Sequence, residues 1–203
     1  MKKLMILAMM LTSSFTWSDV SGSVSYTNDY IFRGVSQGDG NSLQLNLNYE
    51  HSSGFYAGAW TGDVDFGDAD RETDYYVGFM FPVLTDKINL DVGYVDYKYD
   101  NSDYDVSEYY VGVQTVYGLS AYYYQTDDEL KDEFTMVSYT LPFTSGLPVP
   151  FSATIEYMYF EEGEDMFMLN FSKDINDWNL SVKTGEDMVT KSTLTSFAIT
   201  RNF

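Results

Sequence analysis

Most of the chain from residue 19 onward alternates between apolar and polar side chains with a period of two. In residues 43–50 (LQLNLNYE) every second residue is leucine or tyrosine, and every residue between them is polar. The same alternation occurs in 87–94, 151–160 and 178–183. Alternation over about ten residues, broken by Gly, Asn or Asp, is typical of β-strands with two different faces. Helical spacing never persists, so the sequence predicts an all-β fold.

The pattern predicts about twelve strands. They are 20–32, 42–51, 55–63, 72–81, 87–97, 107–117, 119–126, 133–143, 150–160, 165–173, 177–184 and 192–203. Their lengths lie near the 9–11 residues that a tilted strand needs to cross a bilayer. An even number of strands is typical of single-chain outer-membrane barrels. We therefore predict an antiparallel transmembrane β-barrel of about 12 strands over residues 19–203.

Residues 1–18 have the composition of a secretory signal peptide. Lys2 and Lys3 form a positive start, 4–11 is a short apolar run, and small polar residues follow. This run is far too short to cross a membrane as a helix. Without a longer apolar segment, only a closed barrel satisfies the backbone polar groups of an exported chain in lipid. We predict that the barrel lies in the outer membrane of a Gram-negative bacterium.

The connections between the predicted strands alternate in charge. The expected periplasmic turns are 51–54, 82–86, 117–118, 144–149 and 174–176; the expected extracellular loops are 33–41, 64–71, 98–106, 127–132, 161–164 and 185–191. The loops and their flanks hold 20 of the 31 acidic residues, whereas the turns hold only Asp86 and Asp174. Short periplasmic turns and acidic extracellular loops explain this sorting. We expect the acidic rim to face lipopolysaccharide, with outer-membrane lipid around the barrel.

Aromatic residues gather near the predicted strand ends, as in the two girdles of a transmembrane barrel. The expected periplasmic girdle is Phe55, Phe81, Tyr117, Phe143, Phe151 and Trp178; the expected extracellular girdle is Tyr97, Tyr109, Tyr123, Phe134 and Tyr159. The chain ends in Phe203, which resembles the recognition signal of outer-membrane proteins. A soluble β-sandwich or lipocalin-like barrel would also alternate. The signal peptide, the charge sorting and the aromatic ends favour the membrane.

Composition excludes several classes of function. A net charge of −20 excludes a cationic nucleic-acid binder. With no cysteine and one histidine, the chain lacks a thiol nucleophile and a multi-histidine metal site. His51 precedes two serines, but neighbours in one tight turn cannot easily form a hydrolase triad. The acidic loops match no calcium-loop spacing. We predict no enzyme activity, no cofactor and no metal site.

The polar faces of the predicted strands supply the candidate lumen residues. These are Arg33, Glu50, Asp74, Asp91, Glu108, Glu156 and Lys183. The lumen acids outnumber the bases Arg33, Lys87 and Lys183, so a pore with this lining is expected to favour cations. Arg33 is open to two interpretations. Either it sets a local field at a constriction, or it braces the barrel through a buried ion pair with a lumen acid.

The same faces also carry bulky side chains. They are Tyr76, Tyr110, Tyr122, Tyr124, Met158, Met166 and Met168. Twelve strands lie between the filled eight-stranded barrels and the open sixteen-stranded porins. A narrow or blocked lumen is therefore an alternative to an open pore.

Several segments resemble the TorF-type family of proteobacterial porin-like proteins. They are 28–37, 54–60, 72–78, 93–99 and 107–112, the first carrying the specific motif Tyr-x-Phe-Arg-Gly-x-Ser-Gln. The resemblance covers about 19–125, and the remainder only by pattern. After Tyr99 the family often continues with Pro-Gly, whereas this chain has Asp100 and Asn101. The resemblance implies an outer-membrane location and a pore, without an established substrate.

Together these features predict a channel for passive diffusion of small solutes or ions, with a cation bias. The alternative is a non-conducting structural or adhesion barrel with acidic surface loops. A wide hydrated lumen would favour the channel, and a salt-bridged plug of Arg33 with Glu or Asp would favour the alternative. The sequence leaves open the solute and whether the barrels are monomers or form a homo-oligomer.

Overall fold

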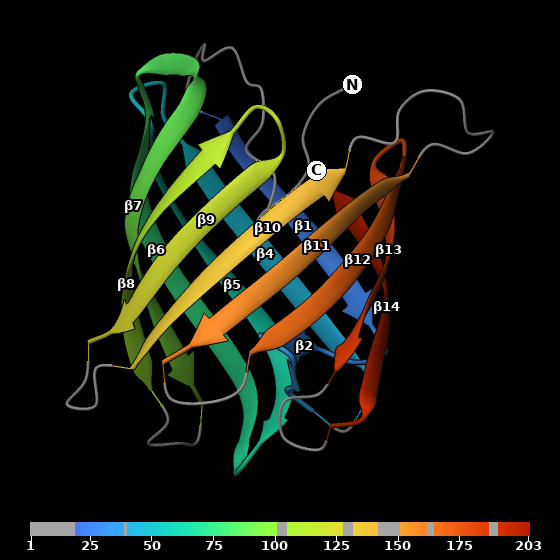
Figure 1. Cartoon of the computed structure of the whole chain (residues 1–203). Coiled ribbons are helices and arrows are strands. Elements are labelled where there is room, and N and C mark those ends of the chain that lie inside the picture. Colours follow the sequence, from blue (N-terminus) through green and yellow to red (C-terminus); the bar gives the residue numbers. More distant parts are fainter. Residues whose placement is uncertain are drawn as a thin grey trace.

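The computed structural model describes residues 19–38, 40–100, 105–127, 132–141, 151–161, 165–186 and 191–203. Within these ranges the chain forms a closed antiparallel barrel of twelve strands and a separate two-stranded hairpin (Figure 1). This confirms the predicted barrel. The expected signal peptide, residues 1–18, lies outside the described residues. No helix in the described part of the chain is long and apolar enough to cross a membrane.

Every barrel strand pairs with its neighbours in chain order, and β14 pairs with β1 to close the barrel. The barrel strands are β1 (Asp19–Thr27), β4 (Ser42–Glu50), β5 (Phe55–Phe66), β6 (Ala69–Val83), β7 (Thr85–Tyr99), β8 (Val106–Thr115), β9 (Leu119–Thr126), β10 (Glu133–Leu141), β11 (Ser152–Phe160), β12 (Met166–Ile175), β13 (Trp178–Glu186) and β14 (Thr193–Asn202). The hairpin consists of β2 (Ile31–Phe32) and β3 (Val35–Ser36). Because the hairpin leaves the sheet, β1 pairs directly with β4.

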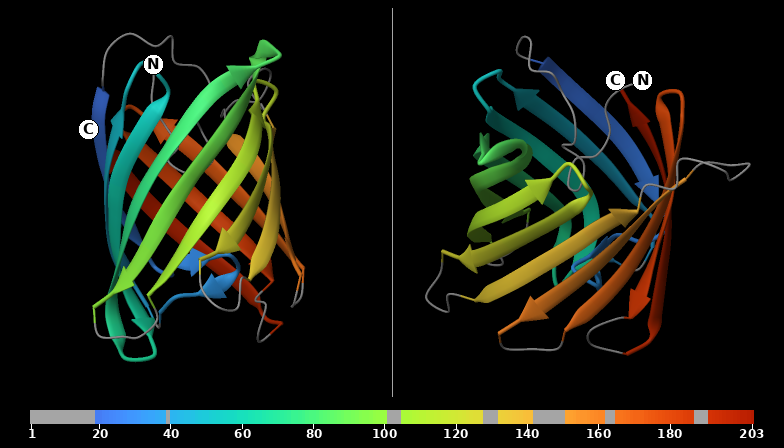
Figure 2. Two further views of the ribbon diagram at one scale, coloured as in Figure 1. Left: turned by 90° about the vertical axis from the view of Figure 1, so that its left-hand side faces the viewer. Right: turned by 45° about the horizontal axis from the view of Figure 1, so that its top comes forward.

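The two ends of the barrel differ in what they carry. One end, which we call the terminal rim, holds the start of β1, the end of β14 and the turn at 51–54 (Figure 1). The opposite end, the loop rim, holds the β5–β6 turn and the β2–β3 hairpin, which lies across the inside of the barrel (Figure 2). The 51–54 turn and the β5–β6 connection, which were expected on opposite sides of the membrane, therefore lie at opposite ends of the barrel.

Side chains are distributed inside out relative to a soluble protein. In β4, Leu43, Leu45 and Leu47 are exposed, whereas Asn46 and Asn48 between them are buried. Each of the twelve barrel strands carries at least one exposed large apolar or tyrosine side chain. An apolar surface this continuous is unfavourable in water and is typical of the lipid-facing band of a transmembrane barrel. The prediction of a polar lumen face and an apolar outer face is confirmed.

The predicted first strand, 20–32, is wrong beyond Thr27. The side-chain oxygen of Asn28 accepts a hydrogen bond of 2.6 Å from the backbone N–H of Phe197 on β14. The Asn28 side chain thus accepts the hydrogen bond that a backbone carbonyl of β1 would accept if the strand continued. The chain then turns inward, and Arg33 and Gly34 (φ 44° and 67°) form the two-residue turn between β2 and β3. Two positive φ angles in succession are typical of a type I′ hairpin turn.

The predicted loop at 64–71 is also largely strand. β5 continues to Phe66 and β6 begins at Ala69, so the connection is a tight turn that contains Gly67 at φ 65°. Beyond the membrane band the pairing is supported by polar contacts, including an Arg71–Asp63 ion pair of 2.5 Å. Polar cross-strand pairs stabilise a sheet without apolar alternation. The hydrophobic pattern stops before the strands do, so the prediction from it made β5 and β6 too short.

The inner wall of β5 to β9 contains four cross-strand pairs of glycine with tyrosine. They are Gly58–Tyr76, Gly78–Tyr56, Gly93–Tyr110 and Gly112–Tyr122. A Cβ atom on any of these glycines would lie 2.3 Å from the facing tyrosine ring or hydroxyl. Each ring therefore lies flat against the wall over a residue without a side chain. This close approach explains glycine inside strands, where it is otherwise unfavourable.

Candidate functional site

The β2–β3 hairpin places Arg33 against the inner wall near the loop rim. The guanidinium donates a hydrogen bond of 2.7 Å to each carboxylate oxygen of Glu108 and one of 3.3 Å to the hydroxyl of Tyr97. The side chains of Arg33 and Glu108 are 19% and 4% exposed. A two-pronged, buried guanidinium–carboxylate pair is the strong form of this interaction. Of the two interpretations of Arg33, the buried ion pair is present in the structure.

Four aromatic rings lie close to the guanidinium of Arg33. The Cζ atom of Arg33 lies 3.8 Å from the ring centre of Phe134, 4.6 Å from Phe32, 5.1 Å from Tyr124 and 5.9 Å from Tyr97. Phe134 and Tyr124 are stacked, with centres 4.4 Å apart and planes within 4° of parallel. Cations are attracted to aromatic faces within about 6 Å. We call Tyr97, Glu108, Tyr124 and Phe134 the cation cage.

Two members of the cage were expected elsewhere. Tyr97 and Phe134 were predicted in the extracellular girdle, and this prediction is wrong because both side chains are buried in the barrel. Along β7, Tyr97 is an even number of residues from Asp91, so both face inward. The other three members of the predicted girdle are exposed: Tyr109, Tyr123 and Tyr159.

Two further carboxylates, on β6, lie in the field of Arg33. Arg33 interacts electrostatically with both Glu72 and Asp74. Glu72 is buried and accepts a hydrogen bond of 2.9 Å from the hydroxyl of Tyr99. The Glu72 and Asp74 carboxyl groups also interact with each other through a side-chain hydrogen bond. Two acids this close share one proton more readily than both ionise, which accounts for the buried oxygens Glu72 Oε2 and Asp74 Oδ1.

Asp91 occupies a separate cluster of tyrosines deeper in the barrel. The hydroxyl of Tyr56 donates to one carboxylate oxygen at 2.7 Å, and that of Tyr122 donates to the other at 2.8 Å. The hydroxyls of Tyr56 and Tyr110 are 2.5 Å apart. Six residues along β7 separate Asp91 from Tyr97, which is about 20 Å of strand. Asp91 is therefore held by neutral donors, without a basic partner in this network.

The other predicted lumen charges lie on different strands. Glu156 on β11 and Lys183 on β13 form an ion pair of 3.8 Å, with side chains 13% and 31% exposed. Glu50 is half-buried and accepts a hydrogen bond of 2.8 Å from Asn48. Lys87 is an even number of residues from Asp91 along β7 and so has an inward-facing position at the terminal rim. There it is exposed, with its ammonium 5.8 Å from the ring centre of Tyr117.

Methionines form an apolar cluster inside the barrel. Met158, Met166 and Met168 are buried and pack with Ile31 of the hairpin. Gly34 approaches Met166 so closely that a Cβ atom would lie 1.5 Å from its methyl group. The hairpin is thus held by the cation cage and by the methionine cluster. The bulky lumen residues predicted from the alternation are inside the barrel and narrow it.

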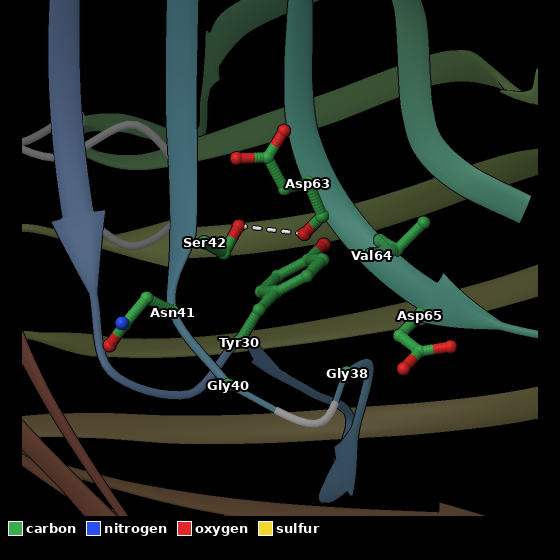
Figure 3. A pocket seen from close by; sticks show the side chains of 8 residues that line it. All are labelled: Tyr30, Gly38, Gly40, Asn41, Ser42, Asp63, Val64 and Asp65. Carbon is green, nitrogen blue, oxygen red and sulfur yellow. Dashed lines mark hydrogen bonds between the residues drawn. The ribbon is translucent and has the colours of Figure 1, made fainter.

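A cavity of about 260 Å³ opens beside the hairpin at the loop rim (Figure 3). It is lined by Tyr30, Gly38, Gly40, Asn41, Ser42, Asp63, Val64 and Asp65. The Ser42 hydroxyl donates a hydrogen bond of 2.7 Å to the backbone carbonyl of Asp63 across its wall. The lining mixes polar side chains with Tyr30, Val64 and two glycines, so the cavity is a recess of mixed polarity at the loop rim.

His51 offers no hydrolase arrangement. Its Nδ1 atom lies 2.8 Å from the Ser53 hydroxyl, within the turn at the terminal rim. In the part of the chain that the structure describes, no carboxylate is hydrogen-bonded to His51. No group of three or more His, Asp or Glu residues suited to a metal ion occurs in the described ranges either.

The closed barrel, its apolar outer surface and its charged interior define a transmembrane β-barrel. Its sequence matches a family model over residues 12–187. The chain belongs to this family, Gcw_chp, described as bacterial proteins of unknown function. No curated protein matches the sequence. The TorF-type name drawn from sequence segments stays a prediction.

Two solved structures have a similar fold. One is a KdgM porin, with a TM-score of 0.64 and 12% identity over 90% of this chain and 98% of that chain. The other is the KdgM porin in complex with disordered oligogalacturonate, with a TM-score of 0.59 and 10% identity over 92% of this chain and 98% of that chain. At these identities the similarity concerns the fold alone.

Proposed function

We propose that this protein is a narrow outer-membrane channel for passive diffusion of small solutes or ions. The observation that carries the proposal is the Glu156–Lys183 pair, which lies on the inner face of the barrel and keeps 13% and 31% of its side-chain surface accessible. Charged groups in a dry, filled barrel would be fully buried. Accessible charges on the inner face support a hydrated passage along β11 to β13.

The interior charges favour cations over anions. Inward-facing carboxylates outnumber the inward-facing basic side chains of Arg33, Lys87 and Lys183 in the described part of the barrel; the acids include Glu50, Glu72, Asp74, Asp91, Glu108 and Glu156. An acidic lining lowers the energy of a cation in the passage and raises that of an anion. A polyanion such as the oligogalacturonate bound by the KdgM porin is disfavoured here. The proposed solutes are cationic or neutral.

The proposed setting is the outer membrane of a Gram-negative bacterium, reached after removal of a signal peptide at 1–18. The apolar outer band supports contact with lipid. The acidic loop rim, with exposed residues such as Asp65, Asp68 and Asp70, supports contact with lipopolysaccharide through bridging divalent cations.

Planar-bilayer recording tests the channel. The refolded protein is measured under a KCl gradient, and we expect stable conductance that reverses toward the potassium potential. Glu50→Gln should shift the reversal potential toward zero, whereas Glu161→Gln, at the exposed loop rim, should not. Absence of conductance from demonstrably folded barrels would contradict the proposal.

A non-conducting barrel is the second candidate, and the Arg33–Glu108 pair favours it. The hairpin fills part of the loop-rim half, and the ion pair fixes it there. If the wild-type barrel is silent and Arg33→Ala conducts, the hairpin is a plug that the ion pair holds closed. If both are silent, a structural or adhesive role for the barrel and its loops replaces the channel.

A further inference from the structure

The cation cage is built without help from the hairpin that fills it. Tyr97, Glu108, Tyr124 and Phe134 belong to four consecutive barrel strands, β7 to β10. Tyr124 and Phe134 are register partners, and the Tyr97 hydroxyl donates a hydrogen bond of 3.0 Å to Glu108. The barrel ladder and this hydrogen bond fix the wall. Removing the Arg33 side chain would leave a preformed pocket with one carboxylate and three aromatic faces.

The chemistry of this pocket is specific for a planar, two-pronged cation. The two oxygens of Glu108 each accept one N–H from the same guanidinium, at 2.7 Å. The Cζ atom of Arg33 lies over the ring of Phe134, 3.8 Å from its centre. A carboxylate fork combined with a stacked ring suits guanidinium better than a spherical ammonium. The β2–β3 turn therefore holds the Arg33 guanidinium in the cage in the way that a bound guanidinium ligand would occupy it.

We propose that the cation cage is a binding site for small solutes that carry a guanidinium group, with Arg33 as the internal competitor. Glu72 and Asp74 interact electrostatically with the same guanidinium and add negative charge near the cage. A solute with a guanidinium at one end and an ammonium at the other would gain a second attraction to these carboxyl groups. This inference deepens the proposed channel function by naming its solute class, but binding itself requires no conduction.

Chemical rescue of Arg33→Ala tests the site. The refolded variant is heated with increasing guanidinium chloride in the low millimolar range, at constant ionic strength, and unfolding is followed by circular dichroism. We expect a saturable rise of about 2–4 °C once the concentration exceeds the dissociation constant roughly fivefold. Sodium chloride and urea, a neutral molecule of the same shape, should give no such rise. Argininamide, which carries both cationic groups, should act at lower concentration than guanidinium.

Two comparisons make the result specific. The double variant Arg33→Ala with Glu108→Gln should lose the response, because the neutral amide no longer pairs with the cation. The wild-type protein should respond much more weakly, because Arg33 fills the cage. Equal responses to guanidinium and sodium in folded Arg33→Ala would overturn the proposal.

Folding failure of the variant is also informative. Arg33→Met keeps most of the apolar stem, and serves if Arg33→Ala does not refold. If neither folds, the refolding yield with and without guanidinium becomes the readout, and a yield that guanidinium leaves unchanged overturns the proposal. Because these measurements need no current, a silent barrel that binds guanidinium would refute the channel and retain the binding site.

Discussion

Arg33 and Glu108 are 75 residues apart in the chain and meet inside the barrel through two hydrogen bonds of 2.7 Å. Removing only one member leaves an uncompensated buried charge, which is strongly destabilising. We expect Glu108→Ala to lower the free energy of unfolding by about 3–5 kcal/mol. Urea titration of the refolded barrel, followed by tryptophan fluorescence, measures the change.

An exposed pair of the same chemistry provides the control. Arg71 and Asp63 are in contact at 2.5 Å, but their side chains are 46% and 38% exposed at the loop rim. Exposed ion pairs contribute about 0–1 kcal/mol. Asp63→Ala should therefore change the free energy of unfolding far less than Glu108→Ala. Equal losses would mean that burial does not strengthen the Arg33 pair, and that the hairpin is held by Met166 and Ile31 instead.

The glycine–tyrosine wall predicts a steric effect at Gly78. A Cβ atom there would lie 2.3 Å from the Tyr56 ring, so Gly78→Ala must displace the ring and its hydrogen bond of 2.7 Å to Asp91. Overpacking of this kind costs about 1–3 kcal/mol. The same urea titration should show this loss.

The steric origin is tested by a double variant. In a Tyr56→Ala background the ring is absent, so Gly78→Ala should become neutral or slightly stabilising, since glycine weakens a strand. Gly40→Ala is the control for the substitution itself, because no atom lies within 4 Å of its added Cβ. A loss at Gly78 that persists without Tyr56 would show that the backbone, and not the ring, requires glycine.

Alternation was sufficient to predict the barrel because lipid and lumen impose opposite demands on successive residues. Leu43 and Asn46 follow this rule, and every barrel strand carries an exposed large apolar or tyrosine side chain, although β10 to β12 also place Phe134, Met158, Met166 and Met168 inside. The hairpin was missed because β2 and β3 have only two residues each, too few for a period. The side-chain cap supplied by Asn28 is a local contact that a hydrophobic pattern does not record.

The cation cage was missed for a different reason. Tyr97 and Phe134 were assigned by their aromatic character and their positions near strand ends, which suits a lipid girdle. Parity alone would have put Tyr97 on the face of Asp91. The partner of Arg33 was beyond prediction, since several inward acids were equally available until the hairpin was placed. The sequence therefore identified the charged residues of the lumen, but their pairing with Arg33 depends on where the β2–β3 hairpin lies.

Phe203 takes part in the seam between β1 and β14 that closes the barrel. The Gly22 N–H donates to the Phe203 carbonyl at 2.9 Å, and the Phe203 N–H donates to the Gly22 carbonyl at 3.0 Å. A Cβ atom on Gly22 would lie 2.6 Å from the Phe203 ring. Gly22→Leu should therefore weaken the β1–β14 seam and reduce the compact, heat-modifiable form in gel electrophoresis. Val24 is exposed on the same strand, so Val24→Leu should leave the amount of the compact form unchanged. If Gly22→Leu and Val24→Leu behave alike, the seam tolerates a side chain at position 22 and the prediction is wrong.

The Glu156–Lys183 pair predicts how the interior sets ion selectivity. Lys183 is one of the few basic side chains at inward-facing positions of the described barrel, so Lys183→Gln should make the passage more acidic and move the reversal potential further toward potassium. Glu156→Gln should move it in the opposite direction, because the lysine then lacks its counter-charge.

Lys98→Gln is the matched control, since Lys98 is exposed near the loop rim and pairs with Asp96 and Asp105. Salt screens exposed charges within about 10 Å at 0.1 M, so the effect of Lys98 should vanish in 1 M KCl while that of Lys183 persists. If Lys98 and Lys183 respond equally at both salt concentrations, selectivity is set at the mouth and not in the interior.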